Sequence, residues 1–164
     1  MIWTVLRVFL GYEWLVAGWE KLTDPTGVWV GEKAGTAISG FFAGAIAKAV
    51  GAHPSVATWY GNFLQNFALP NAKFFSYLIT FGEIMVGISL ILGLFTIIGL
   101  LAGGFMNLNY MLAGTTSTNP VLYTYTFILL MVMMVGTGTY VIGLDHFVLP
   151  FIKKKFGKKT DQSS

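Results

Sequence analysis

Four long apolar runs dominate the pattern of hydrophobic and polar positions along the chain. They cover residues 2–19, 72–92, 95–113 and 121–143. A helix needs roughly 20 apolar residues to cross about 30 Å of hydrocarbon. The pattern therefore predicts an all-α fold, an integral membrane four-helix bundle. Only residues 93–94 separate the second run from the third, so those two helices should be antiparallel neighbours.

The segment between the first two runs, residues 20–70, is too long and too apolar for a plain loop. Its apolar residues recur at the i, i+3, i+4, i+7 spacing of amphipathic helices. The two stripes, on either side of His53-Pro54, are Ile38, Phe41, Phe42, Ala45, Ile46, Ala49 and Val50, then Val56, Trp59, Tyr60, Phe63, Leu64 and Phe67. Two short amphipathic helices are expected in this first outer loop. Anchoring at the membrane surface and a lid over a site explain them equally well.

Composition supports a membrane protein. Apolar residues make up 55% of the chain and charged residues 10%, against about 25% charged in soluble proteins. The mean hydropathy is +0.69. One membrane domain, residues 1–150, is expected, followed by a lysine-rich tail, residues 151–164.

The distribution of charge predicts the orientation. Five of the ten basic residues lie in the tail, which should therefore be cytoplasmic, and an even number of spans places the N-terminus there too. Arg7, Glu13 and Glu20 interrupt the first run, which favours a retained span over a cleaved signal. We expect a multi-pass protein of the plasma membrane. Membrane lipid, rather than nucleic acid, is the expected partner of this basic chain.

Glu83 is the only charged residue between Phe74 and Leu92. An acid inside a membrane span usually faces the bundle interior or a polar cavity. From the helical rise, Glu13 and Glu83 lie roughly 15–16 Å from the cytoplasmic ends of their helices and Asn107 roughly 18 Å. These three side chains should therefore share one level, below an outer mouth that holds Glu20 and Lys21.

Arg7 is rotated by about 120° from Glu13 on the same helix, so the two should not pair. Arg7 should instead pair across helices, with Glu83 or Asp145 as the acid. Such a pair could serve only to fix helix register, or it could take part in function, and the sequence leaves both open.

The residue types also narrow the chemistry. The chain has no cysteine, which removes thiol–disulfide exchange, Cys-ligated iron–sulfur clusters and Cys-based zinc sites. His53 and His146 fall on opposite sides of the membrane in the predicted topology. No metal or haem is therefore expected, and redox work would need a diffusible cofactor or a partner.

Three stretches resemble the DoxX/DoxD family of small four-span membrane proteins: AGWEKLTDP at 17–25, GEIMVGISLILGLFT at 82–96 and NLNYMLAG at 107–114. In that family the first helix holds an Arg and ends in Gly-x-x-Lys, and the second carries a Glu before a Gly-rich run. The matching residues here are Arg7, Gly18, Lys21, Glu83, Gly87 and Gly93.

The resemblance implies redox work at the membrane. DoxD is the large subunit of a thiosulfate:quinone oxidoreductase that works with a small DoxA partner. On this hypothesis the chain is an oxidoreductase subunit linked to the quinone pool, with thiosulfate as a candidate electron donor. Glu83 and Glu13 would exchange protons with the quinone, and the binding residues would be Arg7, Lys21, Glu20, Asn107, Asn109 and Tyr110.

A second hypothesis comes from a different class. The chain could be a non-catalytic membrane adaptor, or a small-molecule-binding subunit of a redox or stress-response complex. The outer helices would then dock a partner through Phe41, Phe42, Trp59 and Phe63. A homo-oligomer is compatible with either hypothesis.

Overall fold

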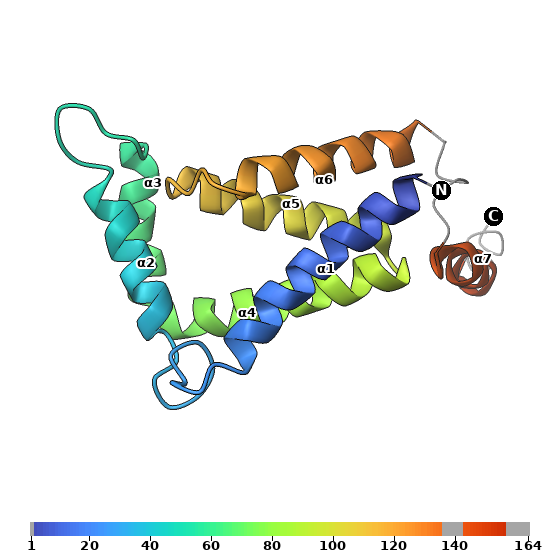
Figure 1. The fold of residues 1–164 in the computed structure, drawn as a ribbon, viewed down its shortest axis with the longest axis horizontal. Coiled ribbons are helices and arrows are strands. Elements are labelled where there is room, and N and C mark those ends of the chain that lie inside the picture. The colour runs from blue at the N-terminus through green and yellow to red at the C-terminus, as the bar shows by residue number, and fades with distance from the viewer. Residues whose placement is uncertain (1, 136–142, 157–164) are drawn as a thin grey trace, which may run out of the picture.

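The computed structural model describes residues 2–135 and 143–156, and all regular structure in these residues is helical. Four long helices run side by side (Figure 1): α1 (Ile2–Leu22), α4 (Ala72–Leu92), α5 (Thr96–Leu112) and α6 (Asn119–Met134). Helix α1 packs on α4, α4 on α5, α5 on α6, and α6 returns to α1. The all-α prediction is confirmed, and so is the antiparallel pairing of α4 and α5 across a short turn.

Small residues let α1 and α4 approach most closely. A Cβ atom on Gly18 would lie 2.8 Å from the Ile84 backbone nitrogen, and one on Gly11 would lie 2.8 Å from that of Ile91. From the other side, a Cβ on Gly87 would lie 2.6 Å from the Leu15 nitrogen. Only glycine allows this backbone spacing. These contacts fix the register between α1 and α4, which in turn positions the polar residues described below.

The segment between α1 and α4 forms a lid across one end of the bundle (Figure 1). It contains α2 (Thr36–Ala47), α3 (Thr58–Phe63) and a π-helical turn, η1 (Leu64–Ala68). Its core continues into α4 and α5, and its buried members are Ile38, Phe42, Ala45, Ala49, Val56, Tyr60, Leu64, Ala68, Ala72 and Ala113. The two predicted amphipathic segments are thus helical and cap the bundle.

Four residues of the predicted stripes lie on the outside of the lid. They are Val50, Trp59, Phe67 and Phe63, which are 70%, 64%, 55% and 39% exposed. Phe42, which the adaptor hypothesis places on a docking surface, is buried, and that part of the hypothesis is wrong. The reason is that α2 turns this ring inward, where it packs edge-on against Phe75 of α4.

The outer surface of the bundle is apolar. Large exposed hydrophobic side chains follow one another along α4, where they are Phe74, Leu78, Phe81, Met85, Ile88 and Leu92, and similar residues cover α1, α5 and α6. Water-soluble proteins rarely expose so much contiguous apolar surface. Among the described helices, α4 is the one both long and apolar enough to cross a membrane on its own, while α5 and α6 are shorter apolar helices.

The opposite end of the bundle carries α7 (Asp145–Phe156), which the sequence pattern did not predict (Figure 1). The predicted domain boundary at residue 150 falls inside this helix. Both Asp145 carboxylate oxygens accept hydrogen bonds from backbone N–H groups at the start of α5, from Phe95 at 2.6 Å and Thr96 at 2.8 Å. The predicted fourth run extends to Gly143, but α6 ends at Met134; residues 136–142 and 157–164 lie outside the described part of the chain.

Candidate functional site

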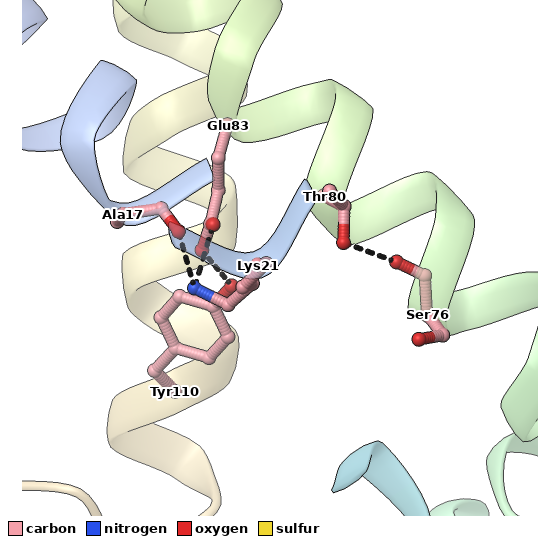
Figure 2. Close-up of polar contacts among 6 residues, drawn as sticks. All are labelled: Ala17, Lys21, Ser76, Thr80, Glu83 and Tyr110. Atoms are coloured by element: carbon pink, nitrogen blue, oxygen red, sulfur yellow. Dashed lines mark hydrogen bonds and ion pairs between the residues drawn. The ribbon is translucent and has the colours of Figure 1, made fainter. Parts of the chain in front are cut away.

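Glu83 lies at the centre of a polar cluster between α1, α4 and α5 (Figure 2). Its side chain is 2% exposed, and its Oε2 atom is 2.7 Å from the Nζ atom of Lys21. The Tyr110 hydroxyl donates a hydrogen bond of 2.8 Å to the other carboxylate oxygen, Oε1. Both oxygens of this buried acid are therefore bound by donors from two different helices.

Lys21 is held in place from three sides. It stands in the last turn of α1, where its ammonium also donates to the Ala17 carbonyl oxygen at 3.2 Å, an arrangement that suits a cation at a helix C-terminus. The Trp29 ring lies over the ammonium, 5.1 Å away at its centroid. Trp29 is itself fixed to α4, because the Ser76 hydroxyl donates to its carbonyl oxygen. The loop after α1 thus folds back and covers the ion pair.

These groups line a cavity of about 340 Å³, which we call the polar cavity. It extends between α1, α5 and the start of α6 and also touches the lid. Its lining includes Glu13, Trp14, Lys21, Trp29, Phe41, Ile79, Glu83, Asn107, Tyr110, Thr115 and Asn119. The cavity therefore brings together two acids, one cation and several neutral donors.

Two buried side chains in its wall lack hydrogen-bond partners. Asn107 is fully buried, and neither its amide nitrogen nor its carbonyl oxygen is bonded. Trp14 is 4% exposed, and its indole Nε1 is likewise unbonded. A buried polar group without a partner costs about 1–3 kcal/mol and calls for an explanation. A polar ligand in the cavity would supply the missing partners.

A second cavity of about 380 Å³ lies beside the first, between the lid and helices α4 and α5. We call it the apolar chamber. Its lining is mostly aromatic and aliphatic, with Phe41, Phe63, Leu64, Ala68, Leu78, Ile79, Gly82, Phe105, Met106, Asn109 and Tyr110 among its residues. Phe41, Ile79 and Tyr110 belong to both cavities.

Five of the residues predicted from the sequence meet at the polar cavity: Glu83, Glu13, Lys21, Asn107 and Tyr110. The other predicted residues lie elsewhere. Glu20 lines an open depression at the outer side of Lys21. Asn109 faces the apolar chamber, where its side-chain and backbone oxygens both accept from the Tyr60 hydroxyl at 3.1 Å. Burial raises the pKa of Tyr60, so this phenol is a neutral donor.

The predicted common level of Glu13 and Glu83 needs correction. Glu83 packs beside Gly18, because a Cβ atom on that glycine would touch both the Glu83 Cβ and Ile84. Glu13 is five residues, or about 7 Å, further along α1. The predicted level takes Ile2 and Leu92 as lying at one depth, whereas Gly11, nine residues after the start of α1, packs beside Ile91, one residue before the end of α4. Both acids nevertheless reach the same cavity.

Arg7 lies at the α7 end of the bundle, far from the polar cavity. Its guanidinium packs so closely on Gly93 that a Cβ atom there would overlap Nη1. Its electrostatic neighbour is Asp145, one of the two acids that the sequence allowed, while Glu83 pairs with Lys21. The alternative pairing of Arg7 with Glu83 is wrong.

The sequence did not predict the aromatic residues that line the polar cavity beside Tyr110, which are Trp14, Trp29 and Phe41. Trp14 lies on the same face of α1 as Ala17 and Lys21, and this spacing could have identified it. Trp29 and Phe41 had no such signal, because the loop and the lid bring them to the cavity. Among the described residues, no group of three or more His, Cys, Asp or Glu side chains is placed to hold a metal ion.

Comparison with known proteins gave one match. The DoxX family model matches residues 2–116, which is more than half of the chain and includes the lid, Glu83 and Tyr110. No curated protein and no solved structure matches this chain.

Proposed function

The chain belongs to the DoxX family of membrane-associated proteins, and we propose that it binds a quinone in the polar cavity as a subunit of a membrane oxidoreductase. One observation carries the proposal. A buried acid, held by Lys21 and Tyr110, shares a cavity with the Asn107 amide and the Trp14 indole, which have no hydrogen-bond partner among the described residues. A buried acid beside convergent polar groups in a pocket is typical of ligand sites.

The residues present suit a flat ligand with carbonyl oxygens. Asn107 and Trp14 offer N–H donors that have no partner in the part of the chain that the structure describes. Lys21 and Tyr110 are further donors, at present shared with Glu83. Aromatic rings from Trp14, Trp29 and Phe41 line the same space and could pack against a ring system.

When bound, a quinone would accept two electrons and two protons. Glu83 is placed to hold one proton at the cavity wall, and Glu13 is a second acid on the same cavity. Lys21 connects Glu83 to the outer depression that contains Glu20 and Asp24, so polar groups continue from the buried acid to the surface. Such a series can resupply protons to a general acid.

The electron donor would be bound elsewhere. Thiosulfate, the donor that the DoxD resemblance implies, gives up two electrons when two molecules join through a new S–S bond as tetrathionate. Among the described residues that line the polar cavity, Lys21 is the one cation, and Glu83 already neutralises it. A dianion would therefore find no net positive charge there. This favours a donor site on another subunit, such as a DoxA-like partner.

The alternative function, a non-catalytic binding subunit, uses the same cavity without electron transfer. Its specific support is the exposed aromatic surface of the lid, Trp59, Phe63 and Phe67, whose rings pack in a row through Tyr60. Such a surface suits a partner subunit or the membrane interface. The two functions differ in whether quinone binding is accompanied by turnover.

The test measures quinone binding to the purified protein in lipid nanodiscs. Binding is measured by calorimetry with a short-chain benzoquinone. Asn107→Leu removes the unpartnered amide and should weaken binding at least tenfold while leaving stability unchanged or higher. Asn62→Leu, the same change at an exposed position of α3, is the control.

With a two-electron donor and its partner subunit present, Glu83→Gln should abolish quinone reduction and Glu83→Asp should retain part of it. Equal binding by wild type and Asn107→Leu would contradict the site, whereas binding without turnover would favour the alternative function.

A further inference from the structure

The apolar chamber opens toward the apolar outer surface of the bundle. Leu78 of α4 and Phe105 of α5 line it and are 52% and 68% exposed, and Phe63 of the lid is 39% exposed. The same side chains belong to the surface that would meet lipid hydrocarbon. The chamber is thus accessible from the side of the bundle, between α4, α5 and the lid.

The polar groups of the chamber are already satisfied, unlike those of the polar cavity. The Tyr60 hydroxyl donates to Asn109, and the Asn109 amide nitrogen donates to the Phe105 carbonyl oxygen at 2.7 Å. No polar atom of the described chamber lining is among the buried atoms without a partner. An apolar occupant therefore suits the chamber, because burying it leaves no hydrogen bond unmade.

The two cavities share part of their walls, because three residues line both of them. Tyr110 presents its hydroxyl to Glu83 on the polar side, and its ring packs edge-on against Phe41, with centroids 6.2 Å apart. Ile79 completes the shared wall. Rotation of these shared side chains is the movement that would join the cavities, since rotamer changes are local and fast.

We propose that the ligand of the polar cavity is an amphiphile that enters from the bilayer, and that its aliphatic chain lies in the apolar chamber while its carbonyl head lies beside Glu83. This inference rests on the proposed function and specifies its substrate class: a lipid-soluble quinone with a chain, rather than a water-soluble one. Each cavity alone is close to the lower limit of about 300 Å³ for ligand pockets. The two together accommodate a head and several carbons of its chain.

Gly82→Leu is the variant that tests the chamber. Gly82 lines the chamber but not the polar cavity, and a Cβ atom there would be in ordinary contact with Met106, at 3.5 Å from its sulfur. The Gly82→Leu protein should therefore fold normally, and its leucine side chain should fill part of the chamber. Gly44→Leu, on a helical glycine of the lid whose Cβ would meet nothing within 4 Å, is the matched control.

The experiment measures affinity for two quinones with the same head, one without a chain and one with a ten-carbon chain, in nanodiscs of fixed composition. The wild type and Gly44→Leu should bind the chain-bearing quinone at least tenfold more tightly. Gly82→Leu should lose this advantage and still bind the chainless quinone within twofold of wild type. The longer quinone partitions into lipid to the same extent for every variant in one type of nanodisc. Differences in affinity between variants therefore do not come from partitioning.

Each other outcome has a distinct meaning. Equal affinity for the two quinones in the wild type, or equal weakening of both by Gly82→Leu, would overturn the chamber while leaving the proposed function intact. Failure to bind either quinone would overturn the proposed function and the chamber together. Gly82→Leu could weaken binding of the chain-bearing quinone while Asn107→Leu leaves it unchanged. That result would support the apolar chamber as the site of the chain and contradict the polar cavity as the site of the head.

Discussion

The two ends of α1 each place a cation beside an acid, and the surroundings of the two pairs differ. At the lid end, Lys21 meets Glu83 at the wall of a cavity that also holds unpartnered polar groups. At the α7 end, Arg7 lies near Asp145 and packs on the backbone of Gly93. The pairs contain the same types of charge, so only the surroundings distinguish their roles.

The carboxylate at the α7 end is occupied by structural bonds. Both Asp145 oxygens accept backbone N–H groups at the start of α5, and the Asp145 N–H donates to the Gly93 carbonyl oxygen at 2.8 Å. This pair therefore joins α1, α5 and α7 as a structural connection. Glu83, in contrast, is bound only by side chains that could release it to a ligand.

The largest expected effect on stability comes from Gly93→Ala. Gly93 has φ +66°, and an added Cβ would overlap the buried Arg7 guanidinium and lie 2.7 Å from the Gly143 Cα. Strain at positive φ and collision with packed atoms should together lower the free energy of unfolding by about 3 kcal/mol or more. Thermal unfolding in detergent is the measurement.

Gly51→Ala separates the two causes. Gly51 has φ +104°, but nothing lies within 4 Å of its added Cβ, so this variant carries only the conformational strain. Its free energy of unfolding should fall by about 1 kcal/mol. If the free energy of unfolding fell by the same amount in both variants, the close packing of Arg7 on Gly93 would make no contribution to stability.

The next effect concerns the lid-end pair. Glu83→Gln leaves the Lys21 ammonium, only 19% exposed, without its counter-charge, and should lower stability by up to about 3 kcal/mol. Lys21→Met combined with Glu83→Gln removes both charges and should restore most of that loss. Quinone binding and turnover should stay defective in the double variant. Restored activity together with restored stability would assign Glu83 a purely structural role.

The smallest effect on quinone binding is expected for Asp145→Asn. Asparagine has one acceptor oxygen, so it can accept from only one of the two backbone N–H groups that Asp145 binds, and it removes the charge beside Arg7. Stability should fall by about 1–3 kcal/mol. Affinity for quinone should remain within twofold of wild type, measured by the same calorimetry. A loss of affinity comparable to that of Asn107→Leu would mean that the two ends are coupled.

The sequence predicted the parts of this molecule that depend on local patterns. Glu83 stood out because it interrupts an apolar run, and the lid helices followed from spacing. The partner of Glu83 could not be predicted in this way. It depends on the offset between α1 and α4, which the contacts of Gly11, Gly18 and Gly87 determine, and a register of this kind is a tertiary property.

The cavities could not be predicted from local sequence patterns either. Tyr110 was a candidate ligand residue, but its place between two cavities depends on Phe41, which arrives from the lid. The α7 helix was missed because its sequence reads as a lysine-rich tail, and Asp145 begins it through bonds to a distant turn. In both cases a contact between remote segments decides the structure.

The π-helical turn η1 has a geometric consequence for the lid. Three buried residues of α3 and η1, Tyr60, Leu64 and Ala68, follow one another at intervals of four. In a regular α-helix, positions four apart drift by about 40° around the axis at each step, so such a row would wind away from the bundle. A wider turn takes up the extra angle and keeps the row in line. Deleting one residue between 64 and 68 would therefore leave Tyr60 and Ala68 out of phase, so that these two residues could no longer both face the bundle.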